Sequence, residues 1–226
     1  MLREVSPDRL WISESPLRFY GIEMGMRMSV CRLSDGDLWV HSPLELDRGL
    51  RRTLDSLGQV RYVVSPNKLH HLFMGYYAAA YPDARIYASP GLPKKRPDLP
   101  FHATLGDRPE PEWERCLDQT MFRGNAFMEE VVFLHRQSRT LILADLLESA
   151  HPDSSPLMRL FRRLFGIYEK PGPPLDMKLL FRDRAAARAS LERVLSWDFD
   201  RIILAHGHLV ETDGKKVLRK AYSFLR

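Results

Sequence analysis

The sequence has few cysteines and no long hydrophobic run. Only two of the 226 residues are cysteines, Cys31 and Cys116, and they lie in separate segments without CxxC spacing. This spacing argues against a disulfide scaffold and a zinc ribbon, and it is typical of a reducing compartment. No apolar stretch is long enough to span a bilayer. Residues 1–13 carry charges and lack the apolar core of a signal peptide. We therefore expect a cytoplasmic protein.

The sequence also lacks the motifs of several common function classes. It has no phosphate-binding loop, no GxGxxG after an expected strand, no GxSxG and no nucleic-acid-binding motif. The net charge of +5 arises from 34 Lys and Arg against 29 Asp and Glu, and the arginines are spread along the chain. This distribution favours a solvated basic surface, although an anionic substrate or surface also fits it. We expect a small-molecule substrate or ligand as the partner; the oligomeric state stays open.

The hydrophobic pattern is that of one α/β domain. An apolar content of 44% over 226 residues favours one sizeable core over two full domains. Strand, helix, strand, helix and strand follow one another between residues 38 and 88, which predicts parallel pairing. Residues 93–115 are rich in proline and charge, and we expect them to be irregular. We expect strands at 10–12, 27–33, 38–41, 60–64, 85–88, 116–122, 131–136, 140–144 and 201–205, and helices at 44–57, 70–81, 181–195 and 215–225.

Three short apolar runs that are typical of buried strands stop at residues that can bind a metal. Residues 61–64 run into a loop that ends in His70 and His71. Residues 141–144 run into Asp145, and residues 202–205 run into the sequence His-Gly-His that starts at position 206. Loops at strand ends often build a site around one crevice of a rigid sheet. A single buried histidine is more often a core residue, but three such strand ends predict a shared metal site.

Short motifs along nearly the whole chain carry a resemblance to a known family. They lie at residues 27–28, 38–43, 64–67, 70–72, 129–133, 138–141, 144–146, 197–200 and 205–207. Together with the order of the elements, they resemble the DUF4336 family in the superfamily of the metallo-β-lactamase (metallo-hydrolase) fold. The resemblance implies a single domain over residues 1–226. It implies an αβ/βα sandwich of two mixed sheets with outer helices, and an insertion at 147–180.

The chain departs from this superfamily at the first of its two metal sites. The superfamily signature His-x-His-x-Asp-His falls on residues 65–70, and only the last position, His70, matches. A further histidine, usually in a segment such as His-Thr-Pro-Gly-Ser, falls on Ala126. The resemblance therefore implies that the first metal site, which is built from three histidines, is lost. Ser65 and Asn67 stand at two of its positions, where we expect them to bond local backbone.

The second metal site of the superfamily keeps three positions. The resemblance places them at His70, Asp145 and His206, with His208 as an alternative register for the last. Two imidazoles and a carboxylate suit zinc, iron or manganese, and three ligands leave room for a water. A divalent cation lowers the pKa of such a water until hydroxide is available near neutral pH. We expect a divalent metal, zinc or iron, at this site.

A fourth ligand is open between His71 and Glu130. Neighbouring histidines on a helix point about 100° apart, so His71 joins His70 on one metal only if His70 lies in the loop. Otherwise His71 packs inward or caps a helix. Glu130 is expected to face the sheet interior near Asp145, paired with a metal, an arginine or His135. We expect His135 itself to be structural and hydrogen-bonded near a turn.

Two function classes follow from these residues. The first is a metal-dependent hydrolase with a degenerate site, whose substrate the sequence does not identify. The second is a binding protein that keeps the fold and has lost the chemistry. An amphipathic basic stretch at 157–165 is open to three readings: packing on the domain, covering the site, or lying on an anionic membrane.

Overall fold

The computed structural model of the chain describes residues 2–19, 22–23, 25–149 and 171–225. A seven-stranded sheet has the order β1-β2-β5-β6-β7-β8-β9. Its strands from β1 to β6 pair antiparallel, and those from β6 to β9 pair parallel. The strands are β1 (Arg3–Ser6), β2 (Leu10–Ser15), β5 (Met26–Arg32), β6 (Leu38–His41), β7 (Val60–Val64), β8 (Arg85–Ala88) and β9 (Phe101–Thr104).

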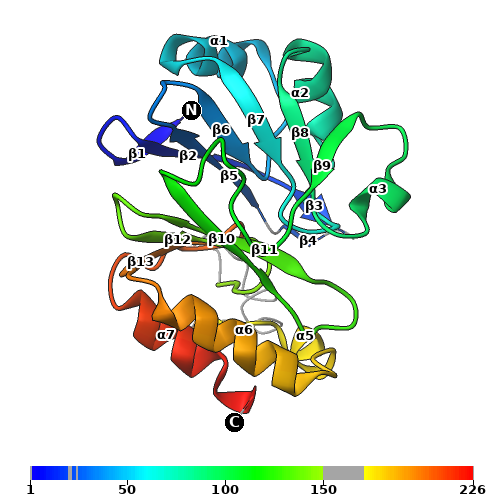
Figure 1. Cartoon of the computed structure of the whole chain (residues 1–226), viewed down its shortest axis with the longest axis vertical. Coiled ribbons are helices and arrows are strands. Elements are labelled where there is room, and N and C mark those ends of the chain that lie inside the picture. Colours follow the sequence, from blue (N-terminus) through cyan, green and yellow to red (C-terminus); the bar gives the residue numbers. More distant parts are fainter. Residues whose placement is uncertain (1, 20–21, 24, 150–170, 226) are drawn as a thin grey trace.

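A four-stranded sheet of order β10-β11-β12-β13 faces the first one (Figure 1). The strands β10 to β12 pair antiparallel, and β12 pairs parallel with β13. A short ribbon, β3 (Arg18–Phe19) with β4 (Ile22–Glu23), lies beside the main sheets. The four strands of the second sheet are β10 (Leu117–Phe122), β11 (Glu130–His135), β12 (Thr140–Ile142) and β13 (Arg201–Ile203).

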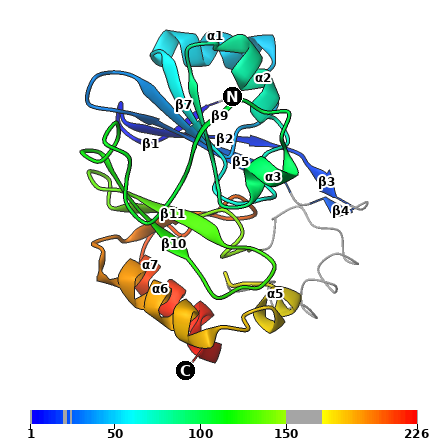
Figure 2. The same cartoon turned by 45° about the vertical axis from the view of Figure 1, so that its right-hand side comes forward.

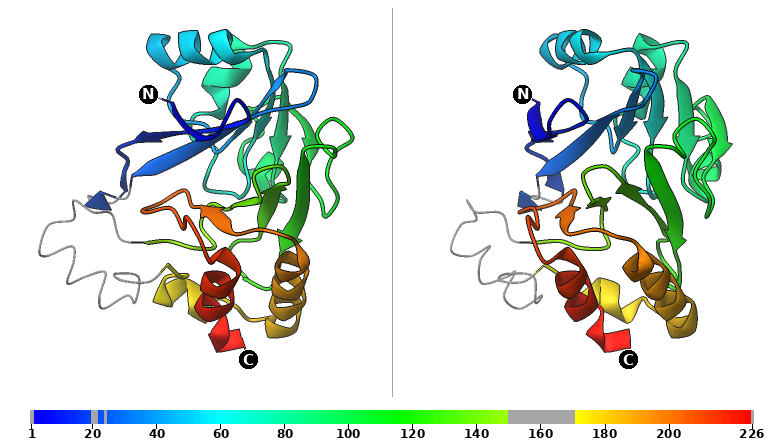
Figure 3. Two further views of the ribbon diagram at one scale, coloured as in Figure 1. Left: turned by 90° about the vertical axis from the view of Figure 1, so that its left-hand side faces the viewer. Right: turned by 60° about the vertical axis from the view of Figure 1, so that its left-hand side comes forward.

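Helices cover the outer faces of both sheets. The helices α1 and α2 lie over the seven-stranded sheet, and α6 and α7 lie under the four-stranded one, which Figure 3 shows nearly edge-on. The shorter α3 and α5 lie toward one side of the molecule (Figure 2). The helices are α1 (Arg48–Leu57), α2 (Met74–Ala80), α3 (Leu92–Lys95), α5 (Leu175–Leu179), α6 (Arg184–Ser196) and α7 (Gly214–Ala221), followed by the 3₁₀ helix η1 (Ser223–Leu225). Among the described residues no helix is long and apolar enough to cross a membrane.

Three apolar layers hold this sandwich together. One lies between α1, α2 and the large sheet, one between the two sheets, and one between the small sheet and α6 and α7. The middle layer is aromatic: the rings of Trp39 and Phe133 meet edge to face at 4.8 Å, and Trp113 packs beside Trp39 at 6.4 Å. Burial of such side chains is worth about 2–3 kcal/mol each. The middle layer therefore fixes the two sheets, and the loops that they carry, against each other.

Local sequence explains where the main helices begin. The carboxylate of Asp47 accepts a hydrogen bond from the amide of Leu50 and caps α1, and Asp183 caps α6 in the same way through Ala186. Such caps satisfy amides that have no partner inside the helix. The turn between β5 and β6 needs Gly36, whose φ is +92°.

The predicted fold class is confirmed: two mixed sheets with outer helices form one αβ/βα sandwich. Some predicted boundaries were wrong. The helix predicted at 70–81 begins only at Met74, because residues 67–73 form turns. Residues 93–115, predicted to be irregular, contain α3 and the edge strand β9. The insertion predicted at 147–180 falls mostly on residues 150–170, which lie outside the described residues. The amphipathic stretch 157–165 lies outside them too.

Candidate functional site

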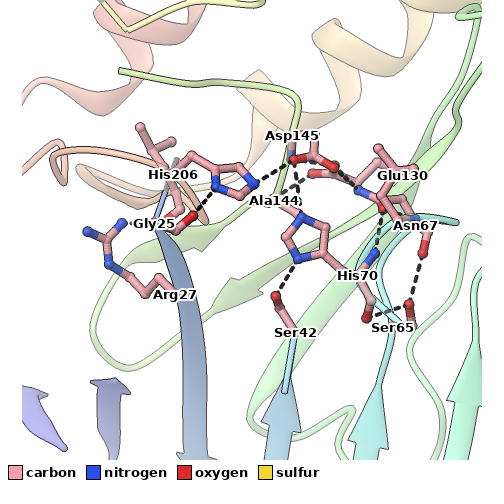
Figure 4. Close-up of polar contacts among 12 residues, drawn as sticks. Gly25, Arg27, Ser42, Ser65, Asn67, His70, Glu130, Ala144, Asp145 and His206 are labelled. Carbon is pink, nitrogen blue, oxygen red and sulfur yellow. Dashed lines mark hydrogen bonds and ion pairs between the residues drawn. The ribbon is translucent and has the colours of Figure 1, made fainter. Parts of the chain in front are cut away.

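Three loops from both sheets meet at one edge of the sandwich (Figure 4). His70 lies in the turns after β7, Asp145 follows β12, and His206 follows β13. Because β12 and β13 are parallel neighbours, their following loops leave the sheet at the same edge. The loop from β7 reaches the same edge from the other sheet, where the amide of Val131 bonds the carbonyl of Pro66 at 2.9 Å. The site is therefore built across the two sheets.

The side chains of His70, Asp145 and His206 converge on one point. The Nε2 atoms of both histidines lie 3.1 Å from the same oxygen, Oδ1 of Asp145. The ligand atoms of the three residues all lie within 4.8 Å of one another, and all three side chains are buried. This confirms the prediction that the three converge. Two imidazoles and one carboxylate at this spacing are a donor set that fits a divalent cation.

Each imidazole is held from behind through its other nitrogen. Nδ1 of His206 donates to the carbonyl oxygen of Gly25 at 2.7 Å, and Nδ1 of His70 lies 2.5 Å from the hydroxyl of Ser42. A metal-binding histidine usually has its second nitrogen fixed in this way, which leaves Nε2 directed at the metal. Ser42 occupies a backbone conformation, φ +55°, that few residues other than glycine adopt. The structure thus maintains local strain at a residue that positions His70.

Arg27 fixes the turn that carries His206. Its guanidinium donates to the carbonyl oxygens of Leu204 and Gly207, which lie on either side of the histidine. A salt bridge of 2.8 Å to Glu14 orients the guanidinium, whose pKa is lowered by burial. Gly207 has φ +84°, and a Cβ there would lie 2.1 Å from a backbone oxygen of the adjacent loop. The turn after β13 therefore requires both the arginine and the glycine.

The electrostatics of the cluster favour an ionised Asp145 beside His70 and His206. Burial alone raises the pKa of Asp145, but His70 and His206 outweigh this and bring the pKa well below its usual range. For His206, burial lowers the pKa, but the bond to Asp145 outweighs it and raises the pKa to about 9. A cation that displaces the proton of His206 would therefore meet a carboxylate that is already charged.

Glu130 and Asn67 form a second, fully buried part of the site. The carboxylate of Glu130 accepts hydrogen bonds from the backbone amides of Ala144 and Asp145 at 2.7 and 2.8 Å. The amide nitrogen of Asn67 donates to Oε2 of Glu130 at 2.9 Å and to Oδ2 of Asp145 at 2.8 Å. Burial, together with the charge of Asp145, raises the pKa of Glu130 to about 7. Among the described residues, the hydrogen-bond partners of Glu130 are these amides, and neither an arginine nor His135 is one of them.

The remaining candidates lie outside the convergent cluster. Nδ1 of His71 lies 3.0 Å from the guanidinium of Arg96, and burial with the nearby cations lowers the pKa of His71 to about 4. His208 is exposed, and so is Ala126. His135, predicted to be structural, is hydrogen-bonded through Nδ1 to Ser138 near the β11–β12 turn, as expected. Neither His71 nor Glu130 is part of the group whose ligand atoms meet.

Little in the sequence indicates the residues that position the ligands. Ser42 lies in the motif at residues 38–43 without a predicted role, and Gly25 acts through its backbone carbonyl, which no side-chain pattern can reveal. Arg27 was part of a motif but looked like any other arginine of a basic chain. The place of Arg27 inside an apolar strand is the feature that could have identified it. All residues of β5 except the last are buried, and a buried arginine is rare without a partner.

The first metal position of the superfamily does not fit a cation here. Ser65 uses its hydroxyl to bond the backbone carbonyls of Asn67 and His70 at 2.8 and 2.9 Å. The carbonyl oxygen of the Asn67 side chain accepts from the amides of Leu69 and His70. The hydroxyl of Ser65 and the side-chain oxygen of Asn67 therefore shape the loop, as predicted from their turn chemistry. The second position fits a cation, and the first is filled by protein hydrogen bonds.

Comparison with known proteins places the chain among proteins of this fold. The model of a domain of unknown function (DUF4336) matches residues 7–171. No curated protein matches the chain in sequence. A solved metallo-β-lactamase from Pontibacter korlensis superposes with a TM-score of 0.66 at 11% identity, covering 100% of this chain and 98% of that one. One from Hirschia baltica gives 0.67 at 10%, covering 100% and 97%.

A third solved structure is FIM-1 from Pseudomonas aeruginosa in its mono-zinc form. It superposes with a TM-score of 0.66 at 10% identity and covers 99% of this chain and 95% of that one. At such identities the similarity shows the fold, because one fold hosts many activities. The activity has to be argued from the site itself.

Proposed function

This chain belongs to the DUF4336 family, and on that premise we propose that it is a metal-dependent hydrolase of the metallo-β-lactamase fold. One divalent cation, zinc or iron, would be held by His70, Asp145 and His206. The observation that carries the proposal is the approach of two Nε2 atoms to one carboxylate oxygen at the same 3.1 Å, with both rings held through Nδ1. The substrate would be a small molecule with an ester, thioester, amide or phosphoester bond.

The residues of the site would divide the work as follows. A bound divalent cation supplies a hydroxide from water near neutral pH. His70 and His206 present Nε2 because Ser42 and Gly25 hold the opposite nitrogens. Asp145 supplies negative charge, and its second oxygen stays fixed by the Asn67 amide at 2.8 Å. Burial of these groups keeps bulk water away, so that their charges interact more strongly than at the surface.

A second candidate is a binding protein that uses the same fold without catalysis. The observation that favours it is the hydrogen-bonded filling of the first metal position by Ser65 and Asn67. In that case the cluster of His70, Asp145 and His206 would be a structural ion-pair network. The protonated state of His206, whose pKa is raised to about 9, is consistent with such a network.

Metal content separates the two candidates. Protein purified without added metal is analysed for bound zinc and iron, alongside His206→Ala and the control His208→Ala, which removes an exposed histidine two positions away. The hydrolase proposal expects about one metal ion in the wild type and in His208→Ala, and loss of metal in His206→Ala. Hydrolysis of ester, thioester and phosphoester probes should follow the metal. Absence of metal from all three proteins, before and after zinc is supplied, would leave the binding protein.

A further inference from the structure

The side-chain amide of Asn67 bridges two buried carboxylates. Its nitrogen donates two hydrogen bonds, one to Oε2 of Glu130 at 2.9 Å and one to Oδ2 of Asp145 at 2.8 Å. Its oxygen accepts from the backbone amides of Leu69 and His70 at 2.8 and 3.2 Å. Asn67 is 0% exposed and uses all of its main hydrogen-bonding capacity inside the protein. Figure 4 shows this amide between the two acidic side chains.

Two buried carboxylates that share one donor repel each other, and a proton or a cation between them relieves the repulsion. Here Glu130 and Asp145 are both buried, at 0% and 6% exposure, and the described residues include no arginine or lysine hydrogen-bonded to either. His70 and His206 contact Oδ1 of Asp145, whereas the Asn67 amide meets the other oxygen, Oδ2, together with Oε2 of Glu130. The geometry therefore places a neutral donor between the two carboxylates.

We propose that the carboxamide of Asn67 takes the place of a second cation between Glu130 and Asp145, so that the site holds a single metal ion. The inference rests on the proposed function only in placing the other ion on His70, Asp145 and His206. It follows that the chain carries a latent carboxylate site. Replacing the amide by a carboxylate, Asn67→Asp, would bring three acidic side chains together, and oxygen clusters of this kind prefer calcium, manganese or magnesium.

The test compares Asn67→Asp with a matched control, Asn125→Asp. Asn125 is also buried and also caps its loop, with its side-chain oxygen bonded to the amides of Phe127 and Met128. Its amide nitrogen donates to the carbonyl of Met177 and meets no carboxylate. Both variants therefore bury a new carboxylate, but only Asn67→Asp creates an acidic cluster.

Two quantities are measured on each protein: the thermal unfolding midpoint in chelator and in millimolar calcium or manganese, and the equivalents of manganese bound at equilibrium after zinc loading. We expect both variants to unfold earlier than wild type in chelator. Calcium or manganese should raise the midpoint of Asn67→Asp by several degrees and leave Asn125→Asp unchanged. Asn67→Asp should bind about one manganese ion more than wild type.

Several outcomes would overturn the proposal. Binding of about two ions by the wild type would show that the amide yields to a cation. A midpoint of Asn67→Asp that ignores divalent cations would show that the acidic side chains do not form a site. If Asn67→Asp does not fold, Asn67→Ala is used, which removes the donor without adding charge. Failure of both variants to fold in millimolar calcium or manganese would also contradict the proposal, since a cation should supply what the amide supplied.

The outcomes for this inference and for the proposed function are distinguishable. A wild type without metal, together with cation-dependent folding of Asn67→Asp, would refute the hydrolase and support the role of Asn67. A wild type that binds one zinc ion, together with an Asn67→Asp variant that binds no additional cation, would support the hydrolase and refute the role of Asn67.

Discussion

His206 is held in place by Gly25, a residue 181 positions earlier in the chain, whose carbonyl oxygen lies 2.7 Å from Nδ1 of the imidazole. His206 follows a strand of the small sheet, and Gly25 precedes β5 of the large sheet. The bond makes the orientation of a candidate ligand depend on how the two sheets pack. It also directs Nε2 toward Asp145, because a ring whose Nδ1 donates a hydrogen has its remaining nitrogen on the opposite side.

Metal binding should release a proton below about pH 9. The pKa of His206 is raised to about 9, so in metal-free protein at pH 7 its Nε2 carries a proton that a cation has to displace. The apparent affinity for zinc is then expected to fall roughly tenfold for each pH unit below 9. Calorimetry in buffers of different ionisation enthalpy measures the proton count directly. An affinity that stays constant between pH 7 and 9 would contradict a protonated His206.

The same shift predicts the pH dependence of stability without metal. The folded pKa of His206 lies above the ordinary value of 6.5, so protonation favours the folded state. This contribution is complete below pH 6.5 and is lost as the pH rises toward 9. Chemical unfolding of the metal-free protein at pH 6, 7.5 and 9 should show it, and His206→Gln should flatten the profile in that window. His208→Gln, which changes an exposed side chain, is the control.

Arg27→Met should weaken metal binding more than a comparable loss of an arginine elsewhere. The substitution removes the two hydrogen bonds that bracket His206, so the histidine loses its fixed orientation. We expect a drop in zinc affinity of about 10–100-fold, the range for partners that orient a ligand. Arg32→Met is the control, because Arg32 also donates to a backbone carbonyl, that of Leu57, but far from the site. Equal affinity in the two variants would deny Arg27 a positioning role.

Substitutions at Ser42 should separate its hydroxyl from its backbone. Ser42→Ala and Ser42→Gly both remove the contact to His70 and should both lower zinc affinity about tenfold or more. Glycine adopts φ +55° without strain, so Ser42→Gly should be more stable than Ser42→Ala by about 1 kcal/mol. Urea unfolding and zinc titration measure the two effects. If only the alanine variant lost affinity, the backbone and not the hydroxyl would hold His70.

His135 should make the protein sensitive to acid independently of the metal. Burial lowers its pKa to about 4, so the folded state favours the neutral ring. The stability from this group is present above pH 6.5 and is lost as the pH falls through 4, by about 3 kcal/mol at most. His135→Gln should therefore reduce the acid dependence between pH 6.5 and 4. The neighbouring exposed change Arg136→Gln should leave that dependence in place.

The local pattern of the sequence determined most of the secondary structure. The β-branched runs at 60–64 and 201–205 and the capping residues Asp47 and Asp183 act within a few positions, so they could be predicted without knowing the fold. The three candidate ligands could also be predicted, because each directly follows an apolar run. The three strand ends also predicted that these loops meet, and the structure brings the three side chains together.

The tertiary structure is needed to explain how each ligand is held and what fills the first metal position. The partners of His206 and Asp145 come from loops that are distant in sequence, Gly25 and Asn67 among them, and one of these partners is a backbone carbonyl. No local pattern encodes such contacts, since they arise when the aromatic layer around Trp39 and Phe133 locks the two sheets together. Local sequence patterns identify which groups could bind a metal. The packing of the sheets decided that His70, Asp145 and His206 converge while Asn67 joins Glu130 to Asp145, because hydrogen-bond geometry depends on distances that only the folded chain sets.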